Sequence, residues 1–384
     1  MTQVLRFEKF THIQISFLGI SKRIFEISEQ QRGQKSKTQN FSKMKEAMLY
    51  EKLEKGKNLV KCNLCNHHCV IADGNRGICG VRENRNGILY SLNYGKIIAR
   101  NVDSIEKKPF FHFFPGSNAF SISSEGCNFS CKHCQNWEIS QLVKERKEIY
   151  GENFKPEGIV EMAKREECKS ISYTYTEPTV FFEFAYETAK IAKQQGLYNN
   201  FVSNGYMSEQ TINLMTSNKL IDAVNVDIKG FTEKFYGEIC GASLEKLLKT
   251  TKLLKKTGIW IEITTLLIPT LNDSEKQIKG VIEFVRYELG KETPLHFSLF
   301  YPYYKLTHIP PTPIETARKA REVALELGLR YVYTGNYPGD ERENTYCYNC
   351  KNLLIKRCGF MVEKNLIEKG RCPHCGANID GVFE

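Results

Sequence analysis

The sequence of 384 residues lacks any apolar run approaching the roughly 20 residues needed to cross a bilayer. It also lacks the small-residue cleavage pattern of a secretory leader, although Arg6 and Lys9 precede a short apolar run at residues 13–20. No repeat of the solenoid kind is present. These absences argue against a membrane protein, an exported protein and a repeat protein. We therefore expect a cytoplasmic chain with no membrane partner.

Positive charge is in small excess over most of the chain. The formal net charge is +10, but residues 1–43 carry eight Lys or Arg against three Asp or Glu and so supply half of it. The remainder is a modest charge for a chain of this length, and we do not expect nucleic acid to be the main partner. Within residues 1–43, the stretch 30–42 is polar and poor in aromatic residues, which predicts disorder. Residues 1–43 are thus expected to be a flexible or mis-assigned extension, with Met44 or Met48 as alternative starts.

Residues 116–338 alternate short β-branched or aromatic runs with amphipathic helical stretches, the pattern of repeated βα units. Gly196, Gly258 and Gly328 each stand where a helix should end before the next strand. The predicted strands are 119–123, 170–174, 198–202, 223–228, 260–267, 295–300 and 330–333, and the predicted helices are 156–167, 180–195, 244–257, 275–289 and 313–327. The expected fold class is α/β, as a barrel or a doubly wound sheet, with function in the loops after the strands.

Fourteen cysteines gather in short-spaced sets, which favours metal binding over disulfides in a large chain without a leader. Cys127, Cys131 and Cys134 form a C-x3-C-x2-C triplet directly after the first strand of the βα region. Iron–sulfur cubanes take one thiolate per iron, so three cysteines leave one iron open to a substrate. The alternative is a structural zinc site completed by His133, but its place at a strand end argues against that.

Two further cysteine sets flank the βα region. In 339–384, two C-x2-C knuckles predict a zinc-ribbon-like module that binds zinc, with iron as the alternative; they are Cys347, Cys350, Cys372 and Cys375. In 44–115, a Gly-rich module contains a second set that predicts a structural metal, an auxiliary iron–sulfur cluster or two disulfides; it is Cys62, Cys65, Cys69 and Cys79. Cys168, Cys240 and Cys358 stand alone and are expected to be buried apolar residues.

The triplet resembles the defining signature of the radical S-adenosylmethionine (SAM) superfamily. The resemblance extends from about Met44 to the end, and motifs such as Lys61-Cys-Asn-Leu-Cys-Asn-His-His-Cys69 and Tyr331-Val-Tyr-Thr-Gly-Asn336 resemble the AmmeMemoRadiSam system radical SAM enzymes. That family is similar to the pyruvate formate-lyase activating enzymes. The resemblance implies a partial (β/α)6 TIM-like barrel with Cys-rich modules at both ends, a [4Fe-4S] cluster on Cys127, Cys131 and Cys134, and SAM on the open iron.

The resemblance also implies SAM contacts at the later strand ends. Tyr175-Thr176-Glu177-Pro178 resembles the Gly-Gly-Glu-Pro element that receives the SAM amino group; Tyr175 and Thr176 replace the glycines, and the match is at Glu177 and Pro178. Ser203 and Asn204 resemble the Thr-Asn-Gly element of the activating enzymes, and Asp227 and Lys229 resemble their Asp-x-Lys element, which helps hold the SAM carboxylate. Surface ion pairing is the alternative for each taken alone.

The implied activity is reductive cleavage of SAM followed by hydrogen abstraction from a substrate, as in an activase that installs a glycyl radical on a protein. Expected partners are a low-potential electron donor, a protein substrate, and AMMECR1-like and Memo-like proteins. Glu262 replaces the Arg that follows Trp-Ile in the activases, so their substrate site is not expected to be copied. His296 and the Tyr301, Tyr303 and Tyr304 group are candidates for the substrate end of the barrel, or for ordinary packing. The alternatives are modification of RNA or a small molecule, and a non-catalytic metal-binding adaptor.

Overall fold

The computed structural model describes residues 44–53 and 58–384. The predicted disorder of 30–42 and the extension 1–43 lie outside these ranges. Within them, no helix is long and apolar enough to cross a membrane.

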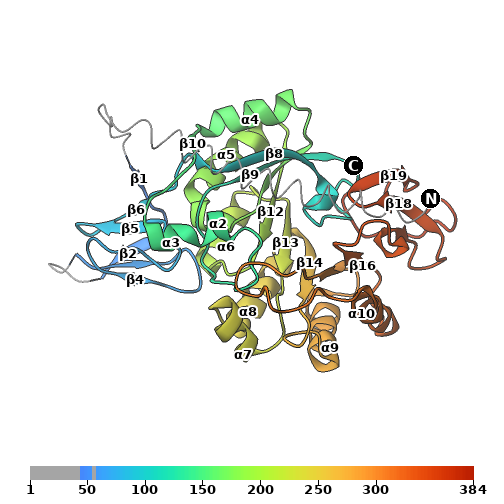
Figure 1. Cartoon of the computed structure of the whole chain (residues 1–384). Coiled ribbons are helices and arrows are strands. Elements are labelled where there is room, and N and C mark those ends of the chain that lie inside the picture. The colour runs from blue at the N-terminus through green and yellow to red at the C-terminus, as the bar shows by residue number, and fades with distance from the viewer. Residues whose placement is uncertain (1–43, 54–57) are drawn as a thin grey trace, which may run out of the picture.

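One large sheet forms the centre of the molecule (Figure 1). Seven of its eight strands are parallel, and they lie side by side in the order in which they follow one another along the chain. These strands are β9 (Asn118–Ser123), β11 (Ser170–Tyr173), β12 (Tyr198–Ser203), β13 (Ala223–Asp227), β14 (Trp260–Leu267), β15 (Leu295–Leu299) and β16 (Val332–Gly335). An eighth strand, β8 (Ala99–Ser104), pairs antiparallel with β9.

This strand order decides between the two expected architectures. A doubly wound sheet reverses its strand order at a switch point, whereas here every parallel strand pairs with its immediate successor. The sheet is therefore singly wound, and its edge strands β8 and β16 do not pair with each other in the described ranges, so the barrel is open. The α/β fold of the partial-barrel type is confirmed, and all seven predicted strands are parallel, one more than the (β/α)6 barrel that the resemblance implies.

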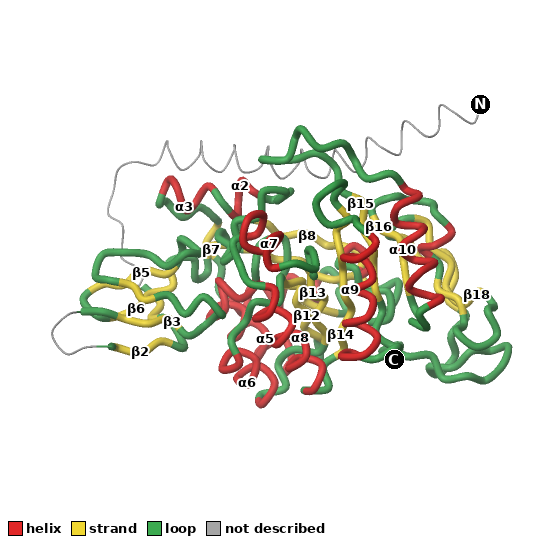
Figure 2. The backbone as a smooth tube through the Cα atoms, turned by 90° about the horizontal axis from the view of Figure 1, so that it is seen from below, coloured by secondary structure: helices red, strands yellow, loops and turns green. Residues whose placement is uncertain are grey.

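Helices connect consecutive parallel strands and lie on the outside of the sheet (Figure 2). The main ones are α4 (Pro156–Arg165), α5 (Phe182–Gln194), α6 (Glu209–Ser217), α8 (Leu244–Lys256), α9 (Glu275–Phe284) and α10 (Ile314–Glu326), with short α2 (Trp137–Ser140), α3 (Leu142–Arg146) and α7 (Glu233–Phe235). The predicted helix 275–289 divides into α9 and a π-helical turn, Val285–Leu289. Gly196, Gly258 and Gly328 have positive φ angles and end α5, α8 and α10 as predicted.

Among the longer elements of the barrel, helix α6 and strand β8 were not predicted from the sequence. Helix α6 contains several Thr, Ser and Asn residues, which have low helix propensity. It nevertheless forms because Ser208 caps its N-terminus and Ile212 and Met215 are buried. Strand β8 precedes the βα repeat and pairs antiparallel, so the repeat pattern gave no signal for it.

The two flanking cysteine regions lie at opposite sides of the sheet in Figures 1 and 2. The N-terminal one contains β1 (Lys45–Glu46), β2 (Tyr50–Lys52), β3 (Val60–Cys62), β4 (Val70–Ile71), β5 (Arg82–Arg85) and β6 (Ile88–Ser91), and the C-terminal one contains β17 (Thr345–Tyr346), β18 (Leu353–Cys358) and β19 (Met361–Asn365). Short strands β7 (Lys96–Ile97) and β10 (Glu152–Asn153) pair beside the sheet. The proposed domain boundaries at 115/116 and 338/339 stay predictions.

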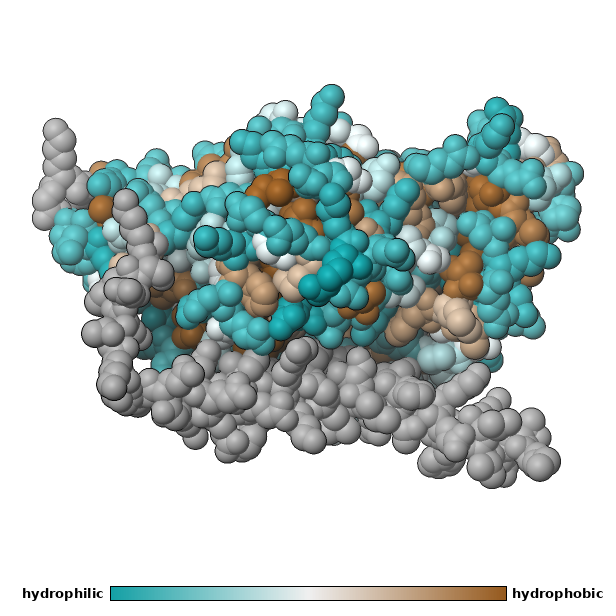
Figure 3. Space-filling view, turned by 90° about the horizontal axis from the view of Figure 1, so that it is seen from above, coloured by the Kyte–Doolittle hydropathy of each residue, from teal (hydrophilic) through white to brown (hydrophobic). Residues whose placement is uncertain are grey.

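The two regions are packed differently. Val60, Leu64 and Val81 belong to the same buried cluster as the barrel strands, so the N-terminal strands share the main core. The C-terminal sheet instead forms a separate cluster with Phe111, Tyr331 and Tyr333. The face in Figure 3 is largely hydrophilic, with small apolar patches between polar residues.

Candidate active site

The cysteine triplet lies on the loop between β9 and α2, at the carboxyl end of the first parallel strand. Cys131 is buried, and Cys127 and Cys134 are half-buried. Two backbone bonds fasten the loop to the π-helical turn Tyr236–Cys240: the amides of Ser130 and Lys132 donate to carbonyl oxygens of that turn at 2.7 and 3.0 Å. The loop is therefore held by a segment more than a hundred residues away in the chain.

The protein environment keeps the three thiols protonated when no metal is bound. Burial raises the pKa of Cys127 and of Cys134. A hydrogen bond with Cys240, together with burial, raises the pKa of Cys131 well above its usual value. Metal binding must therefore displace protons from these sulfurs. Cys240 stands alone in the sequence, and only the fold brings it into contact with Cys131.

Glu177, at the end of β11, connects two strand ends. Its buried carboxylate accepts hydrogen bonds from the Thr179 amide at 3.0 Å, the Ser203 hydroxyl at 2.9 Å and the Asn204 amide at 2.8 Å, and also from the Thr179 hydroxyl. Burial nevertheless raises the pKa of Glu177. Most of its acceptor capacity is used by the chain itself, so this carboxylate holds the loops after β11 and β12 together.

Asn204 connects the hydrogen bonds around Glu177 to the cysteine loop. Its amide group donates to the side-chain oxygen of Asn128 at 2.7 Å and lies 3.9 Å from the Cys127 sulfur. The next residue, Gly205, has φ +67°, and a Cβ there would lie 2.7 Å from a methyl of Val226. Only glycine fits this turn without displacement, which explains the Ser-Asn-Gly sequence at the end of β12.

The end of β13 brings a charged pair beside the same loop. Lys229 Nζ donates to Asp227 Oδ2 at 2.9 Å. Burial lowers the pKa of Lys229, but the charge and the hydrogen bond of the Asp227 carboxylate outweigh it and raise that pKa well above its ordinary value. Lys229 thus stays positively charged next to Cys131, where it can hold a carboxylate or balance a bound anionic cluster.

The segment after β15 lies beside the cysteine loop. The ring of Tyr304, from the segment after β15, stacks on Trp137 at 5.0 Å and 13°. In the same segment, the Lys305 amide donates to the carbonyl of Lys132 in the cysteine loop at 3.0 Å. Of the aromatic group expected at the substrate end, Tyr304 therefore does lie over the cysteine loop.

The donor set fits a cluster with an open iron. The loop supplies three thiolates, and the described residues place no group of three or more Cys, His, Asp or Glu ligand atoms around it within 4.8 Å of one another, as a single ion would need. His133 is buried, burial lowers its pKa to about 3, and neither ring nitrogen has a hydrogen-bond partner. An orphaned buried imidazole indicates a missing polar neighbour, which a bound cofactor would supply.

The C-terminal cysteines do form a compact group. The sulfurs of Cys347, Cys350, Cys372 and Cys375 all lie within 4.8 Å of one another, with Cys347–Cys375 at 3.7 Å and Cys350–Cys372 at 3.6 Å. A tetrahedral ion with bonds of about 2.3 Å to sulfur needs sulfurs about 3.8 Å apart. The geometry is that of a site for one metal ion.

The N-terminal cysteines meet around a small cavity rather than in such a tetrahedron. All fourteen cysteines of the chain have free thiols, so the two-disulfide alternative for Cys62, Cys65, Cys69 and Cys79 is not realised.

One expectation about the substrate end is wrong. His296 lies near the start of β15, at the amino ends of the strands, and its Nε2 lies 2.7 Å from Glu262 Oε2. Glu262 also accepts from the amides of Phe111 and His112 and from the Trp260 indole. His296 and Glu262 therefore close the opposite end of the barrel. The alternation of strand and helix patterns in the sequence predicted β15, but it did not indicate which end of β15 faces the site.

Comparison with protein families matches the model described as the radical SAM superfamily over residues 121–285. Among curated relatives, the Uncharacterized protein MJ0808 of Methanocaldococcus jannaschii is 51% identical over 342 residues, which cover 88% of this chain and 100% of the relative. MJ1632 of the same organism, whose name proposes a glycyl-radical enzyme activating enzyme, is 23% identical over 55% of this chain and 78% of its own length.

Solved structures with similar folds include a domain of a pyruvate-formate lyase-activating enzyme from Bacteroides vulgatus, at 20% identity and TM-score 0.38 over 44% of this chain and 99% of that one. Streptococcus suis SuiB bound to S-adenosylmethionine matches at 15% identity and TM-score 0.46 over 60% of this chain and 53% of that one. At these TM-scores and identities, the activities of the two solved proteins are not transferred to this chain. The family match covers the strands that carry the cysteine loop, so the chain contains a radical SAM superfamily domain, and membership of that superfamily implies an enzyme.

Proposed function

We propose that this chain cleaves SAM reductively and uses the resulting radical to abstract a hydrogen atom from a protein, in the manner of a glycyl-radical activase. The observation that carries the proposal is the convergence of three strand-end segments on the loop of Cys127, Cys131 and Cys134. Cys127, Cys131 and Cys134 would hold a [4Fe-4S] cluster with an iron open to SAM, and this cluster would supply the electron for reductive cleavage of the sulfonium.

Each of these strand ends has a separate task in this proposal. The positive charge of Lys229, fixed by Asp227, receives the SAM carboxylate. Glu177 fixes Ser203 and Asn204, and Asn204 in turn fixes Asn128 beside Cys127. We assign Glu177 mainly to this bracing, with one carboxylate oxygen still able to accept a bond from the SAM amino group. The stacked pair of Trp137 and Tyr304 fixes the segment after β15 beside the cysteine loop.

The test is anaerobic reconstitution with iron and sulfide, addition of SAM and a strong reductant, and quantification of 5′-deoxyadenosine. Cys131→Ala should abolish product, and Cys168→Ala, a buried cysteine remote from the loop, should not. Absence of 5′-deoxyadenosine from protein that holds a reducible four-iron cluster would refute the proposal. The non-catalytic metal adaptor would then be the better description.

A protein substrate is supported by the names of two relatives from Methanocaldococcus jannaschii, both of which propose glycyl-radical enzyme activation. A low-potential electron donor is required, and AMMECR1-like and Memo-like proteins are candidate partners. Because an open iron is oxidised readily, we place this chemistry in an anoxic cytoplasm.

The substrate class can be tested with deuterium-labelled, oxygen-free cell extract divided into protein, RNA and small-molecule fractions. Each fraction is incubated with the reconstituted enzyme, SAM and reductant, and deuterium in 5′-deoxyadenosine is measured by mass spectrometry. Enrichment only with the protein fraction supports an activase. Enrichment with the RNA or small-molecule fraction instead would assign the enzyme to one of those classes.

We propose zinc for the C-terminal set, because the sulfur spacing matches a single tetrahedral ion and a small sheet gains stability from such a ligand. Metal analysis of the Cys127→Ala/Cys131→Ala/Cys134→Ala variant after aerobic purification should give about one zinc per chain.

A further inference from the structure

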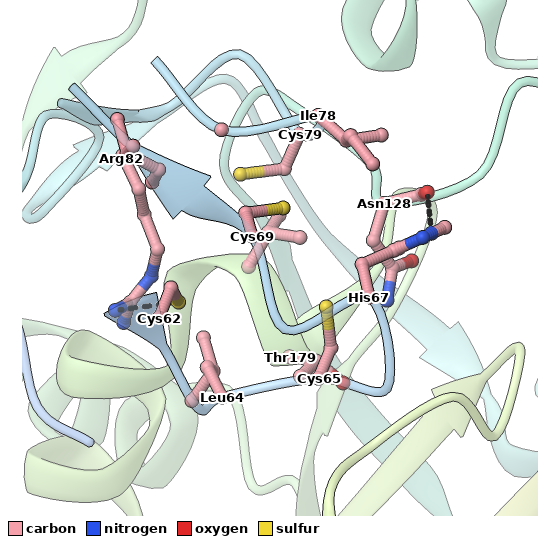
Figure 4. Close-up of a pocket in the computed structure, with 13 residues that line it drawn as sticks. Cys62, Leu64, Cys65, His67, Cys69, Ile78, Cys79, Arg82, Asn128 and Thr179 are labelled. Atoms are coloured by element: carbon pink, nitrogen blue, oxygen red, sulfur yellow. Dashed lines mark hydrogen bonds between the residues drawn. The ribbon is translucent and has the colours of Figure 1, made fainter. Parts of the chain in front are cut away.

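A small cavity lies between the N-terminal strands and the barrel. Its volume is about 20 Å³, and all four cysteines of the N-terminal set line it. Figure 4 shows Cys62 at the end of β3 and Cys65, Cys69 and Cys79 on the surrounding loops, gathered around the same space. We call it the N-terminal cysteine cavity. It also touches Asn128, the residue after Cys127 of the triplet.

The sulfurs around this cavity are spaced differently from those of the C-terminal site. The C-terminal sulfurs all lie within 4.8 Å of one another, as one tetrahedral ion requires. Although all four N-terminal cysteines belong to the described ranges, they do not form a group of that kind. Four thiolates placed around a cavity, too far apart to share one ion, suit a polynuclear centre in which each sulfur binds a different iron.

Two buried donors beside the cavity have no partner. Arg82 is 1% exposed and its Nε–H makes no hydrogen bond, although its terminal nitrogens contact Glu183, the Met48 carbonyl and, at 3.8 Å, the sulfur of Cys62. The Nδ2 group of Asn128 is also buried and unpartnered, and its orientation is fixed because Asn204 donates to the other side-chain atom. Unsatisfied buried donors are rare in native proteins and indicate a missing acceptor.

An iron–sulfur core accounts for both features. Its sulfides and thiolate sulfurs accept hydrogen bonds, and such bonds are among the factors that set cluster potentials. The guanidinium of Arg82 also places positive charge next to a centre that carries net negative charge. A single zinc ion does not satisfy the sulfur spacing.

We propose that Cys62, Cys65, Cys69 and Cys79 bind an auxiliary iron–sulfur cluster of the four-iron type. Four thiolates leave it no open iron, so it binds no substrate there. It lies against the loop of the triplet, where His67 from the cysteine set contacts the Asn128 carbonyl through Nε2 at 2.8 Å. The proposal depends on the residues of this cavity and not on the function proposed for the triplet.

The test counts metals in full-length protein prepared without oxygen. The Cys127→Ala/Cys131→Ala/Cys134→Ala variant should retain roughly four iron and four sulfide per chain after reconstitution. Adding Cys65→Ala and Cys69→Ala should remove them, whereas adding Cys168→Ala should not. The proposal would be overturned if the triple variant contained no iron. This holds whether it bound zinc in addition to the ion of the C-terminal site or no additional metal.

A second measurement covers the case in which the triple variant does not fold. The otherwise unaltered protein should hold roughly eight iron per chain, and Cys65→Ala/Cys69→Ala should halve that number without removing the SAM-sensitive spectroscopic signal of the triplet cluster. Roughly four iron in both proteins would refute the auxiliary cluster. Loss of SAM cleavage with eight iron retained would instead refute the proposed function and leave the auxiliary cluster standing.

Discussion

Replacing Gly205 by alanine tests the packing that positions Asn204 beside the cysteine loop. The new Cβ would lie 2.7 Å from Val226 Cγ1 and 3.2 Å from Leu247 Cδ1, and φ is +67°. The left-handed backbone costs about 1–2 kcal/mol for alanine, and the overpacked contact adds about 1–3 kcal/mol. Alanine also reduces the conformational entropy of the unfolded chain, which stabilises the folded protein by about 0.4–1 kcal/mol. We expect Gly205→Ala to lower the free energy of unfolding by about 2–4 kcal/mol.

Gly258→Ala is the matched control for this change. Gly258 also has positive φ, at +82°, but a Cβ there would meet nothing within 4 Å. It should cost only about 1 kcal/mol, so the difference between the two variants isolates the contact with Val226. Both are measured by anaerobic urea unfolding followed by circular dichroism. Equal losses of stability in the two variants would refute the close approach of β12 and β13 at this point.

Four further predictions concern separate parts of the molecule. Glu262→Ala leaves four donors without an acceptor and should lower the free energy of unfolding by about 3–5 kcal/mol. The amount of 5′-deoxyadenosine formed per folded chain should stay unchanged, because Glu262 lies at the amino end of the barrel. A drop in product per folded chain would contradict that placement. Burial lowers the pKa of His112 to about 4 in the folded protein. As the pH falls below about 6.5, His112 is therefore protonated in the unfolded chain before it is protonated in the folded one. The free energy of unfolding should fall by about 2 kcal/mol between pH 6.5 and pH 5. Urea unfolding at the two pH values measures this loss, and His112→Gln should abolish that part of it. Cys240→Ala should retain the iron of the triplet cluster, because three thiolates and SAM complete it; iron loss equal to that of Cys131→Ala would make Cys240 a ligand. Cys372→Ala should release about one metal ion per chain and expose residues 345–379 to limited proteolysis, and unchanged metal content would argue against the C-terminal site.

Much of the fold could be read from the sequence because its signals are local. The βα alternation and the three helix-ending glycines predicted all seven parallel strands to within about two residues at each end. The predicted C-terminal knuckles lie close enough to share an ion, since C-x2-C geometry depends on a short turn. The antiparallel β8 and helix α6 were missed because neither follows the periodic pattern.

The sequence by itself determined the cysteine spacings, the strand order along the chain and hence the end of the sheet where the site lies. Only the tertiary structure placed Cys240 against Cys131, and Arg82 and Asn128 beside the N-terminal cysteine cavity. It also moved His296 from the expected substrate end to a pair with Glu262 at the other end. These contacts join residues far apart in the chain, so they depend on strand register and on how loops pack across the sheet, which no local pattern encodes.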